Sequence, residues 1–180
     1  RIENIVEEFS GRLAISVLRT EHPYSGPSVA RNLALDMLDT PLVAFLDDDN
    51  LMWPRWMERA TAFLKSDPKI DIIYGVQLRD AEFSKTTKNW FLVPFDFEEL
   101  KQGNYIDLNQ LMHRRSATRF DPALKRLIDW DYVLRLIDSW PDRIVPVDAI
   151  SSLYLASGFD RISVALWPPD LDSGIAEREV

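Results

Sequence analysis

A strand, a helix and a second strand follow one another between residues 42 and 78, and this order constrains the fold more than any other feature. LVAFL (42–46) is short, continuous and apolar, as expected of a strand covered on both faces. RWMERATAFLKS (55–66) has helical spacing after Pro54, and IDIIYGVQL (70–78) has the composition of a strand. This order predicts a parallel α/β unit.

The composition restricts the chemistry that the chain can carry out. Its 180 residues are 46% hydrophobic, which suits one core, and we expect a single domain over residues 1–180. The absence of cysteine excludes disulfides, thiolate nucleophiles and cysteine-ligated metal centres. Only His22 and His113 could supply imidazole groups, so acid–base chemistry falls mainly to carboxylates.

Charge and hydropathy exclude two further classes. The net charge of −8 argues against a nucleic-acid partner, because binding to phosphates requires a basic face. The longest apolar runs have about five residues, whereas a membrane-spanning helix needs roughly 20. We therefore expect no transmembrane segment.

Periodicity assigns most of the other elements. Helices are predicted over 2–9, 28–38 and 129–140, and strands over 13–18, 105–114 and 143–156, the last in one or two pieces. The segment from about 83 to 120 mixes aromatic, polar and proline residues. We interpret it as the region that determines specificity.

Three adjacent carboxylates, Asp47 to Asp49, follow the apolar run 42–46. In open α/β sheets, ligands bind beyond the carboxyl ends of the strands. Mutual repulsion among such charges is relieved by a divalent cation, and Mg²⁺ or Mn²⁺ prefers carboxylate and phosphate oxygens. The plainer interpretation is a solvated loop in which Asn50 caps a helix, and the stretch alone leaves both open.

Two other enzyme classes place acids after a strand. Haloacid-dehalogenase-type phosphatases use Asp-x-Asp-x-Thr/Val, but here Leu51 occupies the Thr/Val position. Receiver domains also need an Asp at the end of a later strand, whereas the next strand ends in Gly75, Val76 and Gln77. Neither pattern fits well.

The order of the surrounding motifs resembles family 2 glycosyltransferases of GT-A type fold. The family's glycine, Ser-x-Ala-Arg-Asn helix start, buried strand and Asp-x-Asp are matched by GPSVARNLALDMLDTPLVAFLDDDN (26–50). Its Phe-Asp-Glu-x-Leu, Glu-Asp-Trp-Asp and Leu-Arg-Leu segment is similar to FDPALKRLIDWDYVLRLID (120–138), and its strand on the acceptor side is similar to NYIDLNQLMHRR (104–115). The resemblance covers residues 10–158. It implies an α/β fold of GT-A (Rossmann-like) type, with a mostly parallel sheet flanked by helices.

The resemblance also implies roles for individual residues. Asp129 occupies the position of the catalytic base, and Asp49 that of the ligand to Mn²⁺ or Mg²⁺. The candidate substrate-binding residues are Asp47, facing the ribose or the sugar, Asp48, the variable middle residue, Arg31 and Asp131. The plainer interpretations are a helix N-cap for Asp129, worth about 1 kcal/mol, and an ordinary ion pair for Arg31.

A metal-dependent, inverting glycosyltransferase of hexosyltransferase type is the function that the resemblance implies. It would move one sugar from a nucleotide-diphosphate sugar to a hydroxyl of a glycan, a lipid-linked molecule or a small molecule. The Gln-x-x-Arg-Trp signature of processive synthases is absent, because Gln110 is followed three residues later by His113. We expect a non-processive, cytoplasmic enzyme, with peripheral attachment to the inner membrane surface as an option.

Several positions depart from the family pattern. Ile128 replaces the glutamate before the base, and Asn50 stands where an acid is frequent. The Pro-Thr-Tyr-Asn and Asp-Asp-Gly-Ser motifs of the family's first strands are absent, so we expect an N-terminally truncated domain. Its parts would be 1–82 on the nucleotide and metal side, 83–160 on the acceptor side and a tail over 161–180. The alternative function is a non-catalytic truncated domain that serves in binding; a haloacid-dehalogenase-type phosphatase is less favoured.

Overall fold

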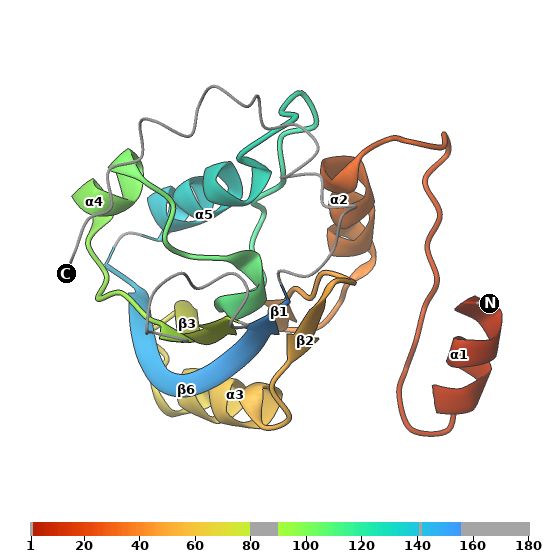
Figure 1. The fold of residues 1–180 in the computed structure, drawn as a ribbon, viewed down its shortest axis with the longest axis horizontal. Coiled ribbons are helices and arrows are strands. Elements are labelled where there is room, and N and C mark those ends of the chain that lie inside the picture. Colours follow the sequence, from red (N-terminus) through yellow and green to blue (C-terminus); the bar gives the residue numbers. More distant parts are fainter. Residues whose placement is uncertain (1, 80–89, 141, 156–180) are drawn as a thin grey trace.

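The computed structural model describes residues 2–79, 90–140 and 142–155. Over these ranges the chain forms one sheet of six strands, with helices on both sides (Figure 1). The strands are β1 (Leu42–Ala44), β2 (Asn50–Met52), β3 (Ile72–Arg79), β4 (Trp90–Phe91), β5 (Leu111–Arg114) and β6 (Ile144–Tyr154). The helices are α1 (Ile2–Phe9), α2 (Pro27–Met37), α3 (Trp56–Ser66), α4 (Phe97–Gln102), α5 (Ile128–Ser139) and the short 3₁₀ helix η1 (Leu108–Gln110).

The sheet is mixed, which corrects the expectation of a mostly parallel one. Its order is β1-β5-β3-β6-β2, with β4 paired to β3, and only the β3–β6 pair of those described is parallel. Both β1 and β3 pair antiparallel with β5, so they run in the same direction, as the strand–helix–strand order predicts. They are not neighbours, because β5 lies between them.

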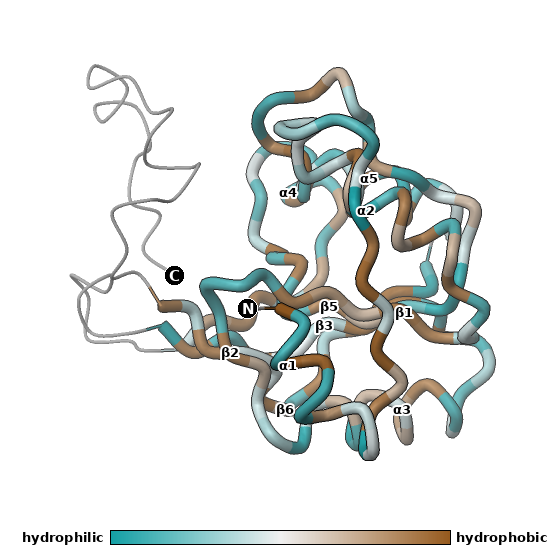
Figure 2. The backbone as a smooth tube through the Cα atoms, turned by 90° about the vertical axis from the view of Figure 1, so that its right-hand side faces the viewer, coloured by the Kyte–Doolittle hydropathy of each residue, from teal (hydrophilic) through white to brown (hydrophobic). Residues whose placement is uncertain are grey.

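Two apolar clusters cover the two faces of the sheet. Neighbouring residues of β3 alternate between them, since successive side chains of a strand point to opposite faces. Ile72 and Tyr74 pack with α5, α2 and α4, whereas Ile73 packs with α3. Figure 1 places α3 on one side of the sheet and α5 on the other, and Figure 2 shows hydrophobic stretches along the middle of the molecule. Because both faces of the sheet are buried, apolar and polar residues do not alternate along the central strands.

The predicted strand over 13–18 is wrong. This segment forms no strand, and Leu13, Ile15, Val17 and Leu18 are exposed. A strand needs a hydrogen-bonded neighbour, and none of the described sheet pairs includes these residues. The preceding α1 forms as predicted but buries no residue and lies apart from the sheet (Figure 1).

Other predicted boundaries change locally. The expected strand over 105–114 divides into η1 and β5, because Asp107 caps a 3₁₀ turn before the strand begins. The expected strand over 143–156 is the single long β6. The tail over 161–180 and the start of the expected specificity region, 83–89, lie outside the described residues.

Gly75 provides a test of the packing between β3 and its neighbours. A Cβ atom at this position would lie 2.6 Å from the Ala149 carbonyl oxygen and 2.7 Å from the Trp56 ring. We expect Gly75→Ala to lower the free energy of unfolding by about 1–3 kcal/mol, as overpacking of a core does. Urea denaturation measures the change. Gly103→Ala is the matched control, because nothing lies within 4 Å of its Cβ position, and equal losses in both variants would contradict the packing.

Candidate functional site

Arg31 joins two of the predicted acidic residues. It lies in α2, which begins after Gly26, a residue with the positive φ of 87° that favours glycine. Its Nη2 donates to Asp47 Oδ1 at 2.6 Å, and its Nη1 donates to Asp129 Oδ1 at 2.8 Å. We call these three residues the ion-pair cluster. Arg31 is thus an ion-pair partner, as the plainer interpretation held, but its partners are two candidate site residues.

Asp129 is not the N-cap of α5. That position is Leu127, which has a φ of 55°, and Asp129 is the second residue within the helix. Its carboxylate accepts from Arg31, 98 positions earlier in the chain, instead of capping its own helix. The N-cap interpretation of Asp129 is therefore wrong.

Asn32 fixes α2 against the loop that precedes α5. Its Nδ2 donates to the Phe120 carbonyl at 2.9 Å, and the Phe120 backbone N–H donates to its Oδ1 at 2.8 Å. The Arg31 guanidinium also lies 5.3 Å from the centre of the Phe120 ring. The adjacent Arg and Asn of the Ser-x-Ala-Arg-Asn motif thus have separate tasks: Asn32 holds two segments together, and Arg31 holds the acids.

The surroundings of Asp129 change its acidity. Burial raises the pKa of Asp129 to about 6, with Arg31 opposing the rise and the charges of Asp47 and Asp107 adding to it. Burial also lowers the pKa of Arg31, but its two carboxylate partners raise it by more, so the guanidinium stays charged. A carboxyl group with a pKa near the working pH is suited to accept a proton.

The sequence interpretation missed two residues near Asp47: Asn109, which holds it, and Asp107, which is bonded to Asn109. Asn109, only 1% exposed, accepts from the Asp47 backbone N–H at 2.7 Å and donates from Nδ2 to Asp47 Oδ2 at 3.1 Å. The same Nδ2 donates to Asp107 Oδ1 at 2.7 Å. Burial raises the pKa of Asp107, and hydrogen bonds from Asn109 offset part of the rise. The sequence signal that could have indicated these two residues is the acid–amide pair Asp107 and Asn109, two positions apart in NYIDLNQ (104–110).

The rest of the acidic stretch is arranged differently. Asp48 and Asp49 are exposed, and Asn50, only 6% exposed, donates from Nδ2 to Asp49 Oδ1 at 3.1 Å. Asn50 begins β2, so the helix-cap interpretation is wrong for it; the N-cap of α3 is Arg55.

Asp131 is not brought into the ion-pair cluster. It pairs with Arg135 at 2.8 Å, one turn further along α5. Residues two positions apart in a helix face different directions, which separates it from Asp129. Its predicted contact with substrate stays a prediction.

The chain's own donors suit a cation that is shared with a substrate. Within the described ranges, no three or more His, Cys, Asp or Glu side chains gather in a way that could hold a metal ion. Mg²⁺ is commonly bound through one or two carboxylates, with substrate phosphates and water completing its shell. The exposed carboxylate of Asp49 at the end of this strand fits that arrangement.

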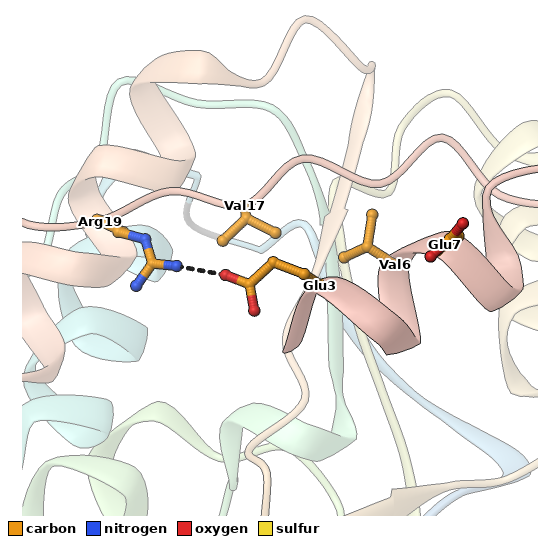
Figure 3. A pocket seen from close by; sticks show the side chains of 5 residues that line it. All are labelled: Glu3, Val6, Glu7, Val17 and Arg19. Carbon is orange, nitrogen blue, oxygen red and sulfur yellow. Dashed lines mark hydrogen bonds and ion pairs between the residues drawn. The ribbon is translucent and has the colours of Figure 1, made fainter. Parts of the chain in front are cut away.

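One cavity lies apart from these residues. It has a volume of about 500 Å³ and is lined by α1 and the segment after it, through Glu3, Val6, Glu7, Val17 and Arg19 (Figure 3). Its charged pair, Arg19 and Glu3, is bonded at 2.7 Å, and both side chains are mostly exposed. It includes none of the predicted site residues, so the candidate site is the ion-pair cluster with Asp49.

Comparison with known proteins identifies the family. Residues 1–126 match the model of a family described as glycosyl transferase family 2. The chain belongs to this family. The match ends before Asp129. No curated protein matches the sequence.

Solved structures confirm the expected fold class. A structure of S. aureus TarS 1–349 in complex with UDP-GlcNAc has a TM-score of 0.72 at 18% identity, over 93% of this chain and 50% of that chain. A second structure of TarS 1–349 has a TM-score of 0.64 at 17% identity, over 85% of this chain and 47% of that chain. A structure of S. aureus TarS has a TM-score of 0.66 at 17% identity, over 86% of this chain and 29% of that chain. This family member thus has the α/β fold of GT-A type with a mixed sheet, and it spans half the length of TarS 1–349 or less.

The length and apolar character of the helices bear on whether the chain could span a membrane. Among the residues that the structure describes, no helix combines the length and the apolar character needed to cross a membrane.

Proposed function

We propose that this chain carries the catalytic site of an inverting, non-processive hexosyltransferase that depends on Mn²⁺ or Mg²⁺. The substrates are a nucleotide-diphosphate sugar and an acceptor with a free hydroxyl group, in a glycan, a lipid-linked molecule or a small molecule. The observation that carries the proposal is the ion-pair cluster, in which Arg31 holds the candidate base Asp129 beside Asp47 at the strand end.

Asp129 acts as the general base. Its carboxylate takes the proton of the acceptor hydroxyl while the hydroxyl oxygen forms a bond to the anomeric carbon of the donor sugar. The bond from that carbon to the diphosphate breaks, and its electron pair leaves with the diphosphate. A single displacement from the opposite side inverts the anomeric carbon.

Asp47 and Asp49 serve the donor side. Asn109 and Arg31 together engage both carboxylate oxygens of Asp47, which restricts the motion of this side chain. In the proposed site, Asp47 faces the ribose or the sugar. Asp49 would hold the cation. When bound, the cation supplies Lewis-acid stabilisation of the negative charge on the leaving diphosphate.

A fluorescence titration tests the donor site. Trp53, 39% exposed, lies four positions after Asp49 and reports on its surroundings. We expect UDP and UDP-GlcNAc, the nucleotide sugar bound by TarS, to quench tryptophan fluorescence saturably when Mn²⁺ is present. Asp49→Asn should weaken this binding by at least about tenfold, since even residues behind a metal ligand contribute that much.

Asp39→Asn is the control for this titration, because Asp39 is an exposed acid before β1. Its titration should match that of the unchanged chain. Quenching that does not need Mn²⁺, or that survives Asp49→Asn, would contradict the metal site.

A further inference from the structure

A second, smaller cavity adjoins the candidate site. It has a volume of about 140 Å³ and lies between the end of β3, the segment leading into η1 and the end of β6. Its lining combines amide, acidic, basic and aromatic side chains: Gln77, Arg79, Phe91, Asn104, Tyr105, Ile106, Asp107, Gln110 and Tyr154. Pockets that enclose a drug-sized ligand measure about 300–1,000 Å³. This cavity therefore has room for one end of a larger ligand.

Gln77 lines this cavity with an unsatisfied donor. Its side chain is 2% exposed, and its Nε2 has no hydrogen-bond acceptor among the described residues. Its Oε1 accepts from Arg79 Nε at 3.4 Å. A buried amide N–H without an acceptor is unfavourable, so the position calls for an oxygen atom from a ligand.

Asp107 supplies a complementary acceptor in the same cavity. Burial raises its pKa, and both Asp107 and Gln77 line the cavity. Most of the other polar groups have protein partners: Gln110 Nε2 donates to the Gly75 carbonyl at 2.8 Å, and Tyr105 donates to the Asp96 carbonyl at 2.8 Å. An amide donor beside a carboxyl acceptor matches a hydroxyl group, which both accepts and donates.

The cavity also connects to the ion-pair cluster. Asn109 Nδ2 donates to Asp107 at 2.7 Å and to Asp47 at 3.1 Å, so one buried amide links the cavity wall to the acids of the candidate site. The charge of Asp107 also acts on Asp129. A ligand held by Gln77 and Asp107 would therefore contact a residue that is hydrogen-bonded, through Asn109, to the acids of the candidate site.

We propose that this cavity binds a hydroxyl-bearing end of the acceptor, a carbohydrate or polyol group held by Gln77 and Asp107. The aromatic rings of Phe91, Tyr105 and Tyr154 suit such a group, because they offer apolar faces beside the polar side chains. The inference rests on the proposed glycosyl transfer and adds the chemical class of the acceptor.

Nuclear magnetic resonance of the ¹⁵N-labelled full chain tests the proposal. The probes are glucose, N-acetylglucosamine and glycerol, each titrated without donor or metal, and the signal is the side-chain amide of Gln77. We expect at least one probe to shift this signal saturably. The Gln77→Leu variant lacks this signal, so its titration follows the backbone amides of Ile106 and Asp107, which also line the cavity. Binding should weaken about tenfold in this variant, equivalent to about 1.4 kcal/mol, whereas Gln102→Leu, at an exposed glutamine of α4, should leave binding unchanged.

A second arm distinguishes the acceptor from the donor sugar. The effective probe is titrated again in the presence of UDP-GlcNAc and Mn²⁺. Binding that persists supports an acceptor site, and competition would assign the cavity to the donor sugar and overturn the proposal. An unshifted Gln77 signal with all three probes would also overturn it. Because the first arm uses no donor, such a failure is separate from a failure of the fluorescence titration.

Discussion

Replacing Asp129 with asparagine is expected to lower kcat for sugar transfer by about 10²–10⁴-fold, the usual contribution of a general base. Asparagine keeps the size of the side chain but cannot accept the hydroxyl proton. Donor binding should change little, because Asp129 acts on the acceptor. The measurement is the rate of UDP release from UDP-GlcNAc in the presence of Mn²⁺ and an acceptor that the unchanged chain uses. The fluorescence titration of the donor is carried out in parallel.

Asp138→Asn is the matched control, because Asp138 is an exposed acid on the same helix, α5. It should transfer sugar at the rate of the unchanged chain. Asp129→Asn with full activity would remove Asp129 from the mechanism. A chain that binds UDP-GlcNAc and Mn²⁺ but transfers to no acceptor would instead favour the non-catalytic binding domain.

Replacing Arg31 with methionine is expected to shift the pH dependence of transfer to higher pH. Arg31 opposes the rise that burial imposes on the pKa of Asp129, so its loss should move that pKa above its value of about 6. The base works only when deprotonated, so kcat/KM falls as pH drops through this pKa. The variant should lose activity at a higher pH, and the acid limb of its kcat/KM profile gives the shift.

The same substitution should also destabilise the fold. Without Arg31, Asp47 and Asp129 lose a charged donor, and their side chains are only 32% and 33% exposed. The expected loss in the free energy of unfolding is roughly 1–3 kcal/mol, measured by urea denaturation at neutral pH. Arg31→Lys keeps the positive charge but not the forked pair of N–H donors. The acid limb of its kcat/KM profile should therefore lie between those of the unchanged chain and of Arg31→Met.

Arg55→Met is the control for Arg31, because Arg55 pairs with Glu58 on an exposed face of the molecule. Surface pairs contribute about 0–1 kcal/mol, and this one should leave the pH profile unchanged. An Arg31→Met enzyme with the original acid limb would show that Arg31 does not control the pKa of the base.

Much of the candidate site could be predicted from the sequence because its motifs are contiguous. The run 26–50 contains Arg31, Asp47 and Asp49, and the run 120–138 contains Asp129, so resemblance alone assigns each a role. The ion pair between Arg31 and Asp129 could not be predicted, since 98 positions separate them. For the same reason Asn109, which holds Asp47 across 62 positions, was missed.

The sequence by itself determined the apolar strands, most of the helices and the acids that follow β1, because local periodicity and local motifs encode them. Only the tertiary structure decided that β5 lies between β1 and β3, that residues 13–18 form no strand and that Asp129 accepts from Arg31. It also brought Gln77 and Asp107 together in one cavity. The physical reason is that strand pairing and buried ion pairs depend on contacts between residues far apart in the chain, which no local pattern records.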